Sequence, residues 1–147
     1  MNRWYIALIL APLAIAAAGC NTMAGTPEFQ QAAIAPPQLT PGDTAVITLE
    51  VKDRHRVIER IEGVVKEDPR ITFRMRDDGV APDEKAGDNI WSLQVDVPFQ
   101  APPGEFVLEF TAYTADGVPV PVRDTQGEVV PLTQELPVVI RYEQQQQ

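Results

Sequence analysis

The segment RITFRMR, residues 70–76, alternates strictly between polar and apolar side chains. Successive side chains of a β-strand point to opposite faces, so this alternation predicts a strand with one buried face. The residues expected to face a hydrophobic core are Ile71, Phe73 and Met75. The residues expected on the opposite face are Arg70, Thr72, Arg74 and Arg76.

The same period of two recurs on both sides of this segment. It is regular in 45–52, 90–97 and 106–113 and less regular in 57–65, 118–122 and 132–142. Within 90–97, Trp91, Leu93, Val95 and Val97 are expected to point inward, and Ser92, Gln94 and Asp96 outward. Proline cannot donate a hydrogen bond to a neighbouring strand, so Pro119, Pro121 and Pro137 predict edge positions or a bulge. The turn sequences TPGD at 40–43 and ADG at 115–117 separate strands.

Together these segments predict an all-β domain, an antiparallel sandwich of about seven or eight short strands over residues 39–142. The chain has 14 prolines among 147 residues, and that many would break a helical bundle repeatedly. In its short alternating strands it resembles the wider immunoglobulin-like and fibronectin-type group, without the Cys…Trp…Cys pattern of antibody domains. Alternation does not fix strand order, so a jelly roll or a small barrel is an alternative.

Residues 1–20, MNRWYIALILAPLAIAAAGC, have the order of an export signal. Arg3 precedes an apolar run from Trp4 to Ala18, and small residues follow it. As a helix this run would extend only ~22 Å, which is short of the ~30 Å hydrocarbon core of a bilayer. The segment therefore predicts a cleaved signal peptide over 1–19 and not a membrane-spanning helix.

Ala17-Ala18-Gly19-Cys20 resembles the lipobox of bacterial lipoproteins. The resemblance implies cleavage before Cys20, a diacylglycerol on its thiol, and a further acyl chain such as palmitate on the new amino group. Asn21 implies sorting to the outer membrane if the cell is Gram-negative, with the domain periplasmic or surface-exposed. The alternative is an ordinary signal peptide cut after Ala18 or Gly19. An unpaired thiol would be a liability in an oxidising compartment, which favours the lipidated form.

Residues 20–38 are expected to form a lipidated, flexible tether, because they lack sustained periodicity and contain Pro27, Pro36 and Pro37. Alternatively, Phe29 and Ile34 attach part of this segment to the domain as a first edge strand. Residues 143–147 are predicted to be a disordered polar tail.

Residues 77–89, here called the acidic loop, place five carboxylates between Asp77 and Asp88, with Lys85 as the one opposing charge. The order DDG, DE, AGD and then Ile-Trp resembles a loop of bacterial immunoglobulin-like domains. One hypothesis is a calcium site with four tentative ligands, which are Asp77, Asp78, Asp83 and Asp88. The other is turn chemistry, in which these side chains accept hydrogen bonds from nearby backbone amides.

Arg70, Arg74 and Arg76 share one face of the predicted strand 70–76. They form either a solvated face or a binding stripe for an acidic or carboxylate-bearing protein surface.

The composition excludes several classes of function. The formal net charge of −9 argues against a nucleic-acid partner, and the single cysteine and single histidine exclude a Cys/His zinc site. His55 lies in the charged stretch KDRHR, which favours a solvated turn over a catalytic base, so no enzymatic activity is expected. No cofactor is predicted beyond possible calcium and the lipid on Cys20. The sequence therefore favours a non-catalytic envelope lipoprotein that binds a protein partner or gives structural support. The alternative is a calcium-stabilised accessory or carbohydrate-binding module.

Overall fold

A computed structural model describes residues 25–142, and every regular element in this range is a β-strand. The predicted signal peptide, Cys20, Asn21 and the tail 143–147 lie outside the described residues. Within each sheet, neighbouring strands run antiparallel. The all-β prediction is therefore confirmed for the described part of the chain.

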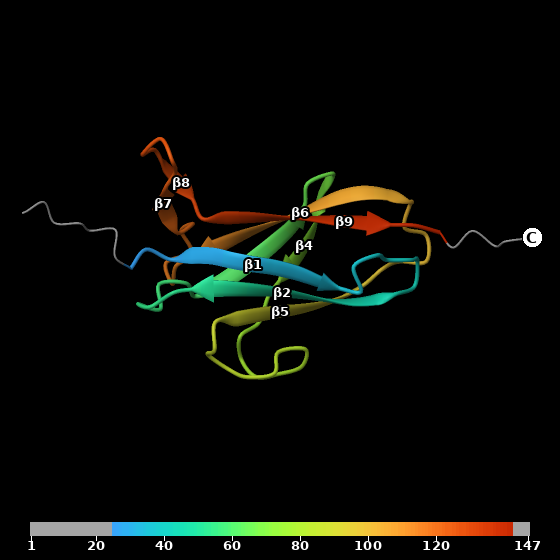
Figure 1. Ribbon diagram of the computed structural model, residues 1–147, viewed down its shortest axis with the longest axis horizontal. Helices are drawn as coiled ribbons and strands as arrows, with labels where there is room; N and C mark the ends of the chain where they lie inside the picture. The colour runs from blue at the N-terminus through green and yellow to red at the C-terminus, as the bar shows by residue number, and fades with distance from the viewer. Residues whose placement is uncertain (1–24, 143–147) are drawn as a thin grey trace, which may run out of the picture.

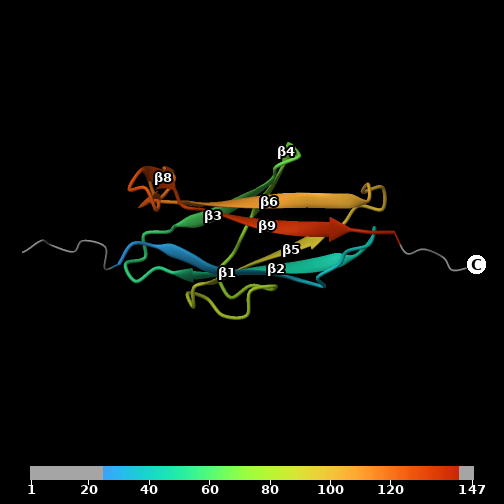
Figure 2. The same cartoon turned by 45° about the horizontal axis from the view of Figure 1, so that its top comes forward.

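Two sheets form the body of the molecule and face each other (Figures 1 and 2). The first has the order β1-β2-β5, with bounds Glu28–Ala35, Thr44–Lys52 and Ile90–Asp96. The second has the order β4-β3-β6-β9, with bounds Asp68–Arg74, Arg60–Val65, Gly104–Tyr113 and Thr133–Ile140. A separate hairpin of β7 (Pro121–Arg123) and β8 (Val129–Pro131) lies at one end.

The core lies between the two sheets, as the period-two pattern predicts. Every second residue of β2 is buried, from Ala45 through Ile47 and Leu49 to Val51. Every second residue of β6 is buried in the same way, namely Leu108, Phe110 and Ala112. Gly63 on β3 leaves room for the Phe110 ring, since an added Cβ would come within 2.7 Å of it. The alternation in these strands thus identifies the core correctly.

The ordered domain begins earlier than the predicted boundary at residue 39. Residues 28–35 form β1, which pairs with β2 from Glu28↔Lys52 to Ala35↔Val46. Phe29 is buried and Ile34 is half-buried, because both pack on the core. The structure therefore confirms the alternative, in which part of the predicted tether forms a first edge strand. The domain begins with β1 at Glu28 and not at residue 39.

The segment 70–76 is not one continuous strand. Residues 69–71 have no partners in the register, because Thr72 pairs with Val64 while Asp68 pairs with Val65. Pro69 cannot donate to the ladder, which favours such a bulge at this position. The β3–β4 hairpin rises away from the second sheet (Figure 2), and Ile71, predicted to be buried, is 44% exposed.

After β4 the chain crosses from the second sheet to the first. The Met75 amide donates to Ile61 of β3, whereas Arg76 and Ser92 of β5 exchange two backbone hydrogen bonds of 2.9 and 2.8 Å. Met75 is only 2% exposed at this crossing. The sequence predicts that Ser92 points outward, but where it bridges to Arg76 it is only 3% exposed. Crossing and bulge together overturn the prediction of a single seven-residue strand.

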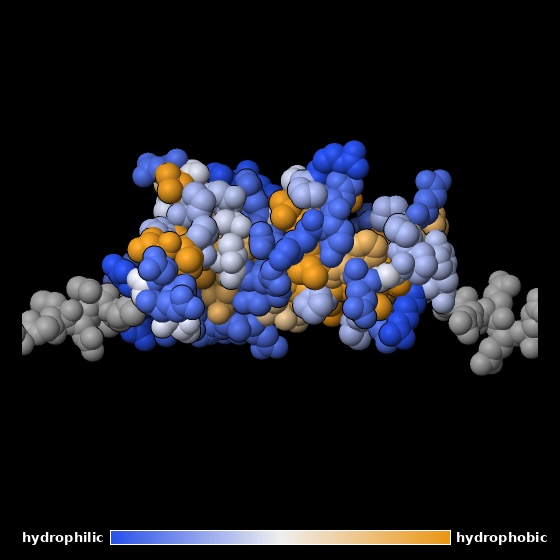
Figure 3. Space-filling model, turned by 90° about the horizontal axis from the view of Figure 1, so that it is seen from above, coloured by the Kyte–Doolittle hydropathy of each residue, from blue (hydrophilic) through white to orange (hydrophobic). Residues whose placement is uncertain are grey.

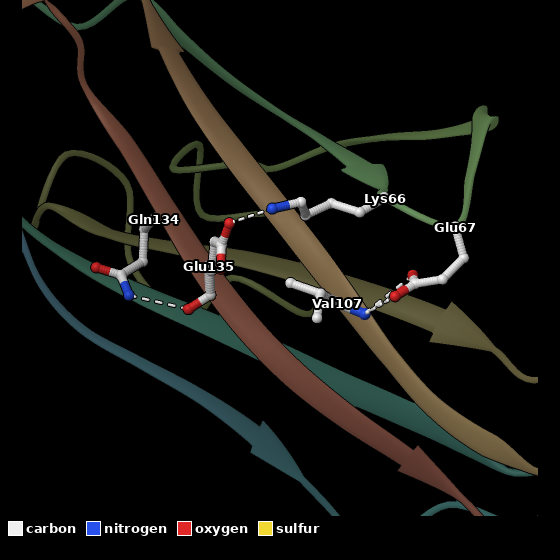
Figure 4. Close-up of polar contacts among 5 residues, drawn as sticks. All are labelled: Lys66, Glu67, Val107, Gln134 and Glu135. Atoms are coloured by element: carbon white, nitrogen blue, oxygen red, sulfur yellow. Dashed lines mark hydrogen bonds and ion pairs between the residues drawn. The ribbon is translucent and has the colours of Figure 1, made fainter.

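Pro137 takes the edge position that the sequence predicts. It lies on β9, the edge of the second sheet, opposite Val107. The Val107 amide turns away from β9 and donates to the Glu67 carboxylate, so the missing N–H of Pro137 faces the free edge. Lys66 reaches across β6 to Glu135 on β9 (Figure 4), and this contact raises the pKa of Lys66.

Between residues 25 and 142 we find no helix with the length and apolar character needed to cross a bilayer.

Candidate functional site

The crossing of the chain at Met75 forms a groove beside the acidic loop. We call it the arginine groove; its volume is about 540 Å³. Its lining residues are Glu59, Arg60, Arg74, Met75, Arg76, Asp77, Asp78 and Trp91. Both candidate sites of the sequence therefore meet here, since two predicted binding arginines and two predicted calcium ligands line one groove.

The three arginines of the groove differ in their partners. Arg60 donates to Glu62 at 2.7 Å, and its guanidinium lies 4.5 Å from the centre of the Tyr113 ring. Arg76 pairs with Asp78 at 2.8 Å. Arg74 is exposed and has no ion pair among residues 25–142. Arg74 is thus the guanidinium most available to a carboxylate from another molecule.

Arg70 does not belong to the groove, which corrects the predicted row of three arginines on one strand face. It lies in the bulge of β4 and makes two 2.8 Å hydrogen bonds to the Asp68 carboxylate. This pair raises the pKa of Arg70 and lowers that of Asp68. Arg76 does not share a strand face with Arg70 and Arg74 either, because it lies beyond β4, in the crossing, where it pairs with Ser92 of β5.

Trp91 and Arg60 complete the groove. The sequence predicts that Trp91 faces the core, and the structure agrees, because Trp91 packs against the core; it is half-buried and also lines the groove. Arg60 was not singled out from the sequence, because its place depends on the pairing of β3 with β6, where it lies opposite Tyr113. Arg60 could have been found as a cationic residue opposite an aromatic residue on the neighbouring strand, but that requires the strand register to be known.

The acidic loop is held by hydrogen bonds from its own backbone. Asp77 accepts from the amides of Gly87, Asp88 and Asn89, at 2.7, 3.2 and 3.3 Å. Asp83 is 4% exposed and accepts from Gly79. These contacts agree with the turn hypothesis.

The loop also needs residues that tolerate a left-handed backbone. Asn89 has a φ of 66°, in the left-handed region where asparagine is among the best-tolerated non-glycine residues. Gly87, two residues earlier, has a φ of 71°. The sequence Gly-Asp-Asn therefore shapes the entry into β5.

Three of the four predicted calcium ligands converge in this loop. Oxygens of Asp77, Asp83 and Asp88 lie within 4.8 Å of one another. Asp78, the fourth, points instead to Arg76, which lowers its pKa. The pKa of Asp77 is raised, chiefly by burial and in small part by the charge of Asp83, against its three backbone hydrogen bonds. A cation among these carboxylates would relieve that repulsion.

Comparisons with known proteins give no family for this chain. No family model matches, and no curated protein matches its sequence. Among solved structures, a Pseudomonas fluorescens alkylpurine DNA glycosylase bound to DNA with an abasic site analog has a TM-score of 0.49 at 9% identity. That match covers 82% of this chain, which spans only 32% of the glycosylase chain. A Niemann-Pick type C2 protein from Japanese carpenter ant has a TM-score of 0.45 at 12% identity, covering 79% of this chain and 93% of that one. Similarity at this level carries no argument about activity, ligand or partner.

Proposed function

We propose that this chain is a lipid-anchored, non-catalytic envelope lipoprotein whose sandwich domain binds a protein partner or supports an envelope assembly. The anchor rests on the sequence up to Cys20, and in a Gram-negative cell Asn21 directs it to the outer membrane. The single observation that carries the interaction is the arginine groove, which Arg60, Arg74 and Arg76 line together with the half-buried Trp91.

Within this proposal the domain is an immunoglobulin-like sandwich whose core consists of seven strands. The sheet orders β1-β2-β5 and β4-β3-β6-β9 support this assignment. In the immunoglobulin fold, the first two strands likewise share one sheet and the third and sixth share the other. The fourth strand departs from the constant-type arrangement, because β4 pairs with β3 and not with β5.

The partner surface is expected to carry carboxylates. Arg74 makes no ion pair with any residue between 25 and 142, and Arg60 and Arg76 have further donors beyond their intramolecular pairs. Trp91 adds an aromatic contact of the kind that dominates binding energy at protein interfaces. The groove is also lined by three acidic residues, Glu59, Asp77 and Asp78. They make binding selective, because they repel a partner whose carboxylates do not lie opposite the arginines.

The anchor is tested by metabolic labelling with a palmitate analogue in cells that make the full chain. We expect label on the wild-type protein and its recovery in the membrane fraction. Cys20→Ser should lose the label and leave the membrane fraction. A labelled, membrane-bound Cys20→Ser chain would contradict the proposed anchor.

The interaction is tested by crosslinking the full chain in membranes and quantifying the recovered partners. The double variant Arg74→Glu/Arg76→Glu should recover at least about tenfold less partner, which corresponds to ~1.4 kcal/mol of binding free energy. Arg70→Glu is the matched control, because Arg70 is equally basic and lies on the same stretch but outside the groove. Equal losses in both variants would contradict a role of the groove.

The second candidate, a calcium-stabilised accessory or carbohydrate-binding module, is favoured by one observation. It is the convergence of Asp77, Asp83 and Asp88 within 4.8 Å. Trp91 would be the sugar-binding surface in such a module, since one face of Tyr113 is covered by Arg60. The hydrogen bonds of Asp77 and Asp83 to the loop backbone account for these carboxylates without a cation, so this remains the weaker candidate.

Calcium at about millimolar concentration should raise the melting temperature of the full chain if the loop binds it. Asp83→Ala or Asp88→Ala should abolish that rise. Asp78→Ala is the control and should keep it, because Asp78 is engaged with Arg76. An unchanged melting temperature of the wild-type protein in calcium excludes this candidate.

A further inference from the structure

A second cavity, of about 410 Å³, lies between the two sheets at the end where β6 begins and β9 ends. We call it the inter-sheet cavity. Protein interiors are close-packed, and voids much larger than a water molecule are few. A volume of this size falls within the ~300–1,000 Å³ of small-molecule sites and is far larger than an ordinary packing defect.

The bulge of β4 lies beside this cavity, which Asp68 and Ile71 line. The β3–β4 hairpin rises away from the sheet (Figure 2), and Ile71 and Phe73 of β4 line the cavity opposite Val95 of β5. Ile71 is 44% exposed and lines the cavity, so the mouth lies between β4 and β5. The cavity extends from there to Val138 and Ile140 on β9, on the opposite side of the sandwich. Figure 3 shows a face of the molecule on which apolar side chains come to the surface between polar ones.

The walls are almost entirely apolar. They come from both sheets, and six of the wall residues are Ile71, Phe73, Val95, Phe106, Leu108 and Val138. Stacked sheets are ~10 Å apart, so the space between them is a slot, long across the strands and narrow between the sheets. Such a slot fits a single hydrocarbon chain better than a bulky ring system.

The rim is acidic. Glu67, Asp68 and Asp96 line the cavity, and no lysine or arginine does so among the residues that the structure describes. Arg70 offsets the charge of Asp68, whereas Glu67 and Asp96 form no ion pair among residues 25–142 and accept hydrogen bonds from Val107 and Thr44. An anionic head group at this mouth would meet like charges.

We propose that the inter-sheet cavity binds the hydrocarbon chain of a single-chain amphiphile whose head group is uncharged or cationic. The apolar slot between the sheets takes the chain, and the acidic rim faces the head. This site is separate from the arginine groove and from the lipid expected on Cys20.

The experiment uses membranes of cells that make the full chain and three photoreactive dodecyl probes. All three carry a diazirine at the end of the chain, and their heads are an alcohol, a trimethylammonium and a carboxylate. After irradiation, crosslinked residues are mapped by peptide mass spectrometry. We expect label on the wall residues Val95, Phe106 and Val138, at least about threefold more from the alcohol and trimethylammonium probes than from the carboxylate probe.

Ile71→Trp should fill the mouth and lower the wall label at least about threefold, because the added ring occupies the path of the chain. Thr72→Trp is the matched control, since Thr72 is the next residue of β4, exposed and outside the cavity, and should leave the label unchanged. If Ile71→Trp does not fold, Ile71→Phe takes its place. Wall residues that stay unlabelled, or label that Ile71→Trp does not lower, would overturn the site. Equal label from the carboxylate probe would overturn the choice of head group.

Discussion

The two long sides of the sandwich join the sheets in different ways. Between β1 and β9, Leu39 bridges through backbone hydrogen bonds, donating to Val139 and accepting from Arg141. Between β4 and β5, the chain itself crosses at Met75, and Arg76 joins the backbone of Ser92. The first junction brings together mainly apolar residues. The second places arginines, carboxylates and a tryptophan around one turn of the chain.

All three candidate features adjoin one irregular strand, β4, or the chain that directly follows it. Ile71 in the bulge at 69–71 lines the inter-sheet cavity, and the crossing that follows lines the arginine groove. The acidic loop then returns the chain to the start of β5.

The largest expected effect separates two residues that the sequence pattern treats as equivalent. Met75→Ala removes a fully buried side chain and should lower the free energy of unfolding by ~2–5 kcal/mol. Ile71→Ala should cost only about 1 kcal/mol, because Ile71 is already 44% exposed. Leu39→Ala on the regular side should match Met75→Ala. Urea unfolding followed by circular dichroism measures all three, and equal losses at 71 and 75 would restore the single-strand interpretation.

Adjacent carboxylates of the acidic loop should differ as well. Asp77→Ala removes the carboxylate that accepts from three backbone amides, of which only Gly87 keeps another acceptor, the carbonyl of residue 77, and should lower the free energy of unfolding by ~1–3 kcal/mol. Asp78→Ala should change it less, since Asp78 is exposed and accepts from only one backbone amide, that of Val80, besides its ion pair with Arg76. The same urea titration at neutral pH compares the two variants. A larger loss of stability in Asp78→Ala than in Asp77→Ala would contradict the hydrogen-bond pattern of the loop.

The backbone at Asn89 gives a smaller effect. Asn89→Val places a β-branched residue at a φ of 66° and should cost ~1–2 kcal/mol. Asn89→Gly removes the steric conflict and should leave stability nearly unchanged. Thermal unfolding of the two variants side by side tests this. A melting temperature of Asn89→Val equal to that of the wild type would mean that the loop takes another conformation.

The pH dependence of stability should be the weakest effect and opposite for the two carboxylates. Arg76 lowers the pKa of Asp78 in the folded state. The stability that ionised Asp78 contributes is therefore present above the unfolded pKa of ~3.9 and is lost as the pH falls through the lower folded pKa. Burial raises the pKa of Asp77, so stability from this group is greatest below ~3.9 and decreases as the pH rises through the raised value.

Urea midpoints of Asp77→Asn and Asp78→Asn, compared with wild type across the acidic range, measure these two contributions. The deficit of Asp78→Asn should shrink as the pH falls, and that of Asp77→Asn should grow. Parallel curves for the two variants would contradict the assigned directions of the pKa shifts.

The parts of the fold that local alternation determines could be predicted from the sequence. The buried faces of β2 and β6 and the edge position of Pro137 follow from side-chain period and missing donors, which are properties of the segment itself. The bulge at 69–71 could not be predicted, because RITFRMR fits a continuous strand equally well. The crossing depends on Arg76 meeting Ser92, sixteen residues later, in the other sheet.

The sequence predicted most of the residues of the candidate site, but not how they are arranged in space. Asp77, Asp83 and Asp88 do converge, whereas Asp78 turns to Arg76 because adjacent residues point in different directions. Arg74 and Arg76 share a groove, but Arg70 is displaced by the bulge. Arg60 enters only through its register with Tyr113, which no local pattern contains.

Amide hydrogen exchange of the full chain, resolved to single residues, tests the crossing most directly. The account predicts slow exchange at Arg76 and Ser92, which donate to each other's carbonyls, and fast exchange at the exposed loop residues 84–86. Exchange at Arg76 and Ser92 as fast as in residues 84–86 would mean that the sheets are not joined there, and the arginine groove would have no structural basis.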